Sequence, residues 1–180
     1  MNKKYNQFLK GCIALIITVA LLYTGQALWQ NYAIDLPLDK ALNEIGGLEK
    51  ISWDTDNNIN SVMNIYVNLG NIENLQKTYE EINKKIEHTL KGREYSLEMT
   101  DNRSQELERA YYDIHYYVQK SIVDGDFPTL EIKVREKADT IGATAKVYVD
   151  EENIYIQFAK NDSHLYAVVA RNSDRIGGNL

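Results

Sequence analysis

The chain has 180 residues, and the roughly 145 that follow its uncharged N-terminal part are enough for one domain with a hydrophobic core. Its formal net charge is −6, and all 26 acidic residues follow residue 34, so residues 35–180 carry −9. A domain this acidic is a poor binder of nucleic acid, which argues against that class of partner. Cys12 is the only cysteine, so residues 35–180 contain no disulfide.

A stretch without any charged side chain extends over residues 11–34, and Lys3, Lys4 and Lys10 precede it. A helix must contain about 20 apolar residues to cross the roughly 30 Å hydrocarbon core of a membrane. Residues 11–29 are close to that length, so the sequence predicts a transmembrane helix that acts as a signal anchor. The lysines in front of it predict that its N-terminal side lies in the cytoplasm.

The predicted anchor separates a basic cytoplasmic tail at 1–10 from an extracytoplasmic part, which begins after a short linker at 30–35. Tyr23 and Trp29 are expected at the far membrane interface, where amphipathic rings are enriched. The prediction is therefore a single-pass integral protein of the cell membrane, with its C-terminal domain outside the cytoplasm.

A cleaved signal peptide is the alternative interpretation of the same segment. Gly25-Gln26-Ala27 has the small-x-small pattern of a cleavage site, and cleavage after Ala27 would release a secreted domain. The uncharged stretch continues past Ala27 and carries aromatic residues suited to an interface, which favours the uncleaved anchor.

Residues 36–101 show helical and strand patterns in the order α-β-β-α-β. The clearest strand pattern lies at 61–69, where apolar side chains occupy every second position from Met63. The predicted elements are a helix at 36–45 ended by Gly46-Gly47, a hairpin of strands at 48–53 and 61–69, a long helix capped by Asn71 and ended by Gly92, and a strand at 95–99.

Residues 102–175 are predicted to form the second half of the same domain, beginning with a helix at 104–123. Residues 128–141 fit both strand and helix spacing, and Pro128, which suits the first turn of a helix, favours the helix. Three alternating segments predict a β-meander, and a loose tail follows it. The strands are expected at 145–149, 154–159 and 165–170, and the tail at 176–180. The predicted fold class is α+β, with antiparallel strands and two to three packed helices.

The run Ala41–Trp53 places a short helix, a glycine pair and a strand in succession, and Gly70-Asn71 leads from the second strand into the long helix. With a further strand at Tyr95–Met99, this order resembles the ring-building domains of flagellar and type III secretion base proteins and of sporulation channel proteins. The resemblance covers residues 36–101 at the level of element order. It implies a membrane-anchored module that packs side by side into rings, with helix faces and sheet edges making the contacts.

The sequence contains no pattern typical of an active site. His88, His115 and His164 lie on different predicted elements, and none has a second ligand at metal-site spacing. Nucleophile and phosphate-loop motifs such as G-x-S-x-G and G-x-x-x-x-G-K-[ST] are also missing from the sequence. We therefore expect a protein that is not an enzyme and that has no cofactor.

Residues 54–60 have oxygen-bearing side chains at alternate positions, as a calcium loop does. The sixth position should be glycine and is Ile59, and the twelfth should be glutamate and is Ile65. The segment therefore lacks both the sharp turn and the bidentate ligand, and we interpret it as a hairpin turn without a metal.

Tyr112 and Tyr116 are four residues apart on a predicted helix and therefore share a patch on its surface. Tyrosine is enriched at protein–protein contacts, so the pair is a candidate partner surface. The alternative interpretation is a helix between a sheet and a second layer, with both of its faces partly buried.

The function that agrees best with these patterns is binding or assembly in a bacterial cell envelope, through a protein partner or through self-association of the outer domain. The bacterial assignment rests on the many asparagine, isoleucine, lysine and tyrosine residues together with the lack of disulfides. A ligand-sensing or solute-binding domain is the alternative, and it would require a concave pocket with converging polar groups.

Overall fold

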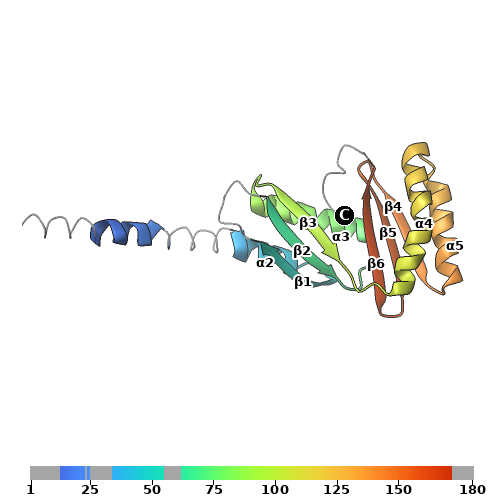
Figure 1. The fold of residues 1–180 in the computed structure, drawn as a ribbon, viewed down its shortest axis with the longest axis horizontal. Coiled ribbons are helices and arrows are strands. Elements are labelled where there is room, and N and C mark those ends of the chain that lie inside the picture. The colour runs from blue at the N-terminus through green and yellow to red at the C-terminus, as the bar shows by residue number, and fades with distance from the viewer. Residues whose placement is uncertain (1–12, 23, 25–33, 55–61, 172–180) are drawn as a thin grey trace, which may run out of the picture.

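The computed structural model describes residues 13–22, 24, 34–54 and 62–171 (Figure 1). Residues 13–22 are helical, and both helices and strands follow them. In chain order these are α2 (Leu36–Asn43), β1 (Leu48–Asp54), β2 (Met63–Leu69), α3 (Leu75–Leu90), β3 (Tyr95–Thr100), α4 (Gln105–Asp124), α5 (Phe127–Thr140), β4 (Thr144–Val149), β5 (Asn153–Lys160) and β6 (Ser163–Ala170).

Within these described residues, no helix has both the length and the apolar character needed to cross a membrane. Crossing a hydrocarbon core of about 30 Å requires a continuous helix of roughly 20 apolar residues. This finding contradicts the predicted anchor at 11–29, together with the single-pass membrane localisation and the membrane partner derived from it. Tyr23, Trp29 and the alternative cleavage position Ala27 lie outside the described residues.

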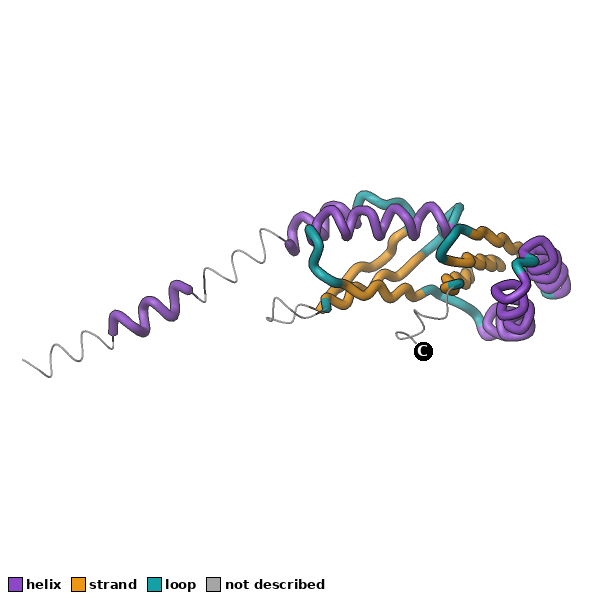
Figure 2. Tube along the Cα trace, turned by 90° about the horizontal axis from the view of Figure 1, so that it is seen from above, coloured by secondary structure: helices purple, strands orange, loops and turns teal. Residues whose placement is uncertain are grey.

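The first sheet contains three strands in the order β1-β2-β3, and α2 and α3 pack on it (Figures 1 and 2). β1 and β2 are antiparallel, as the predicted hairpin requires, whereas β2 and β3 run parallel. The expectation of antiparallel strands is therefore wrong for this pair. The reason is that α3 connects them, and a helical crossover returns the chain to the starting edge of the sheet.

The second sheet is the antiparallel meander β4-β5-β6, which the sequence pattern predicted. α4 and α5 cover its outer face at the end of the molecule farthest from the first sheet (Figure 1). Its inner face contacts α3 and the first half of the domain. Both faces of β5 are therefore buried, which explains why Ile154–Phe158 is buried at every position instead of at every second one.

Two hydrophobic cores share the second sheet between them. The first core lies between α2, α3 and β2, and it receives Tyr155 and Tyr166 from the inner face of the sheet. The second core lies between α4, α5 and the outer face, where Ile156 and Phe158 are fully buried. The alternation of side chains along β5 and β6 therefore joins the two halves into one packed unit.

Four helices, α2 to α5, pack against the sheets in this part of the chain, so the expectation of two to three was too low. The fourth helix is α5, which confirms the helix favoured for the ambiguous segment 128–141. Asp126 is its N-cap, accepting a hydrogen bond from the Thr129 backbone N–H at 3.1 Å, and Pro128 lies in its first turn.

The long helix α3 begins three residues later than the sequence suggested, because its N-cap is Asn74 and not Asn71. The side chain of Asn74 accepts a hydrogen bond from the backbone N–H of Lys77 at 3.0 Å. The residues in front of this helix, 70–74, form the connector between β2 and α3. Both the N–H and the carbonyl of Ile72 bind side chains of the second sheet, and this holds the connector outside the helix.

Candidate partner surface on helix α4

α4 exposes the two tyrosines that the sequence singled out. Tyr112 is 70% exposed and Tyr116 is 74% exposed, and Val123, which is 84% exposed, falls on the same side of the helix two turns further on. We call these three residues the tyrosine face. The opposite side of α4 is buried in the second core through Leu107, Ala110, Ile114 and Val118.

The tyrosine face is held on a well-anchored helix. Ser104 caps the start of α4, where its side chain accepts a hydrogen bond from the Leu107 backbone N–H, and Gly125 ends the helix at a φ of 72°. Lys160 of β5 lies 2.7 Å from Glu106, and Lys137 of α5 lies 2.6 Å from Asp113. These contacts join α4 to both of its neighbours, and its packed side in the second core holds the helix in place.

Charged and polar side chains surround the tyrosine face. Glu108 and Arg109 are exposed one turn before Tyr112, and Lys120 is exposed one turn after Tyr116. Lys120 forms an ion pair with Asp124, and the hydrogen bond to that carboxylate raises the pKa of Lys120 above its ordinary value. The face is thus an aromatic patch with a polar rim, which is the usual anatomy of a protein contact.

His115 contacts Tyr116 edge to face, with ring centroids 6.1 Å apart and an angle of 68° between the ring planes. This contact restricts one side of the Tyr116 ring. A ring that is already oriented loses less side-chain entropy when a partner covers it. Among the described residues no second layer covers Tyr112 or Tyr116, so the alternative of a helix buried on both faces does not describe this part of the chain.

Sequence reasoning missed Val123 as part of this surface. The available signal was its spacing, because a residue seven positions after Tyr116 and eleven after Tyr112 returns to the same helix face. Val123 directly follows Ile122, which is partly buried one turn after the buried Val118, so its apolar character alone suggests a core position.

The edge of the second sheet at β6 is occupied by side chains from the loop before α4. The backbone N–H of His164 donates to Asn102 Oδ1 at 2.8 Å, and that of Tyr166 donates to Asp101 Oδ2 at 2.8 Å. Donors that are already bonded cannot pair with an added strand. This part of β6 is therefore a poor site for a peptide that binds by strand addition.

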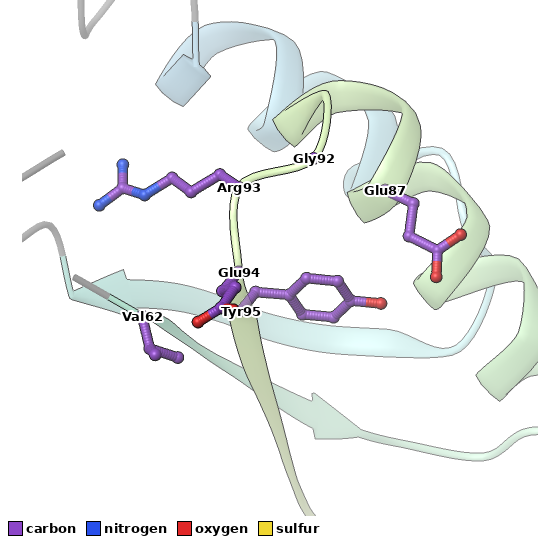
Figure 3. A pocket seen from close by; sticks show the side chains of 6 residues that line it. All are labelled: Val62, Glu87, Gly92, Arg93, Glu94 and Tyr95. Atoms are coloured by element: carbon purple, nitrogen blue, oxygen red, sulfur yellow. The ribbon is translucent and has the colours of Figure 1, made fainter. Parts of the chain in front are cut away.

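A hollow of about 440 Å³ lies where α3 leads into β3 (Figure 3). Its side chains diverge, since Arg93 points to one side while Glu87 and the Tyr95 ring lie toward the other. Burial and the nearby Glu87 raise the pKa of Tyr95 to about 12. The remaining lining residues are Val62, Gly92 and Glu94. Polar groups that point apart do not form the convergent set that a small-molecule site requires.

The three histidines lie on three separate elements. His88 is in the last turn of α3, where a positive charge suits the helix dipole, His115 is on α4, and His164 is buried on β6. Within the described ranges, no group of three or more His, Cys, Asp or Glu side chains could hold a metal ion. Asp54 ends β1, and the rest of the segment 54–60 lies outside those ranges.

Comparison with known protein families, with curated proteins and with solved structures finds no match to this chain. The resemblance of residues 36–101 to ring-building domains therefore remains a prediction. The observed order α2-β1-β2-α3-β3 is the order on which that resemblance rests.

Proposed function

We propose that this chain is a non-enzymatic binding or assembly module, and that the tyrosine face of α4 is the surface through which it contacts another protein. The observation that carries the proposal is the exposure of Tyr112, Tyr116 and Val123 on a helix whose other side is fully packed. Large aromatic side chains at the centre of a polar rim supply most of the binding free energy in protein contacts.

Three further observations support a contact through this face rather than elsewhere. The β6 edge has backbone donors already bonded to Asp101 and Asn102, which disfavours strand addition there. The hollow beside Arg93 has divergent polar groups, which disfavours the alternative of a solute-binding domain (Figure 3). The helix is also held in place by the packing of its other side in the second core, and ion pairs join it to β5 and α5.

Hydroxyl-radical footprinting of the full chain tests the proposal. The modification of each side chain is compared between the dilute purified protein and the protein in intact cells. We expect Tyr112 and Tyr116 to be several-fold less reactive in cells, because a partner covers them, while Leu36 of α2, an exposed apolar residue far from α4, keeps its reactivity. Equal reactivity of the tyrosines under both conditions would contradict the proposal.

A further inference from the structure

We draw no further inference here: the strongest candidate, the exposed apolar surface of the helical run 13–22 with Leu15, Ile16, Leu21 and Leu22, carries nothing because no feature of the described part of the chain shows what covers it.

Discussion

The hydroxyl group of Tyr166 on β6 accepts a hydrogen bond from the backbone N–H of Ile72 at 3.2 Å, across 94 positions of sequence. The same hydroxyl donates to the carbonyl of Gly70 at 2.8 Å. Next to it, Gln157 of β5 donates to the Ile72 carbonyl at 2.9 Å. The second sheet thus satisfies the polar backbone of the connector between β2 and α3, and this fixes the two halves of the domain to each other.

Replacing Tyr166 with phenylalanine should destabilise the protein by about 1–3 kcal/mol, because the buried Ile72 N–H and Gly70 carbonyl both lose their partner. The free energy of unfolding in urea measures this. Tyr66→Phe is the matched control, since it removes one exposed hydrogen bond to Asp54. Equal effects of the two substitutions would contradict the role given to Tyr166.

Gly47 and Gly46 should respond differently to alanine. Gly47 has a φ of +86°, and a Cβ added there would lie 2.5 Å from Ile72 Cγ2 and 3.1 Å from the carbonyl oxygen of Asn71. We expect Gly47→Ala to cost about 1–3 kcal/mol in unfolding free energy. Gly46→Ala meets nothing within 4 Å and should change stability by less than about 0.5 kcal/mol. The thermal unfolding midpoints of the two variants measure this difference. Equal midpoints would contradict the requirement for glycine at position 47.

The tyrosine face should contribute to binding and not to folding. Tyr112→Ala and Tyr116→Ala remove side chains that are mostly in solvent, so the unfolding free energy should change by less than about 0.5 kcal/mol. Ile114→Ala on the buried side of the same helix should cost about 2–5 kcal/mol. If the tyrosine variants proved as destabilising as the isoleucine variant, the tyrosines would be part of the folded core.

Acid should weaken the start of α5. Hydrogen bonds from the side chain and the backbone N–H of Thr129 hold the pKa of Asp126 below its ordinary value of 3.8. The stabilisation is therefore present above the ordinary pKa and is lost as the pH falls through the lower, folded-state pKa. Asp126→Asn keeps a capping oxygen and does not titrate.

We expect unfolding midpoints measured from pH 6 down to pH 3 to fall less for Asp126→Asn than for the wild type, with the difference appearing below about pH 4. Other carboxylates titrate in both proteins, so only the difference between the two curves reports on Asp126. Superimposable curves would mean that Asp126 caps α5 equally well whether its carboxyl group is charged or protonated.

The elements that could be predicted from the sequence are those with an unambiguous period. The apolar stripe on residues 104–123 and the alternating apolar residues in 61–69 indicated which side chains are buried, because one face of each element packs on a core. The meander was also clear, since short turns separate its strands. The parallel pairing of β2 with β3 was not predicted, because periodicity within a strand carries no information about the direction of its neighbour.

Features that depend on distant residues were outside the reach of local patterns. Asn71 and Asn74 are equally good caps by residue type, and the choice between them depends on Tyr166 and Gln157, which bind Ile72. For the candidate site, spacing located Tyr112 and Tyr116 together. Their exposure depends on the position of α4 and α5 at the end of the molecule (Figure 2). The spacing of apolar residues within one helix carries no information about what packs on its other side.

The most direct measurement of the central claim is a photo-cross-link from the tyrosine face. A photoreactive benzoyl-phenylalanine replaces Tyr116 in the full chain, the cells are irradiated, and the adduct is identified by mass spectrometry. We predict a discrete protein adduct heavier than the chain's own mass of 20.7 kDa, and no adduct from the same residue placed at Leu36. If position 116 formed no protein adduct, or cross-linked no more than position 36, the claim that α4 is a protein contact surface would be contradicted.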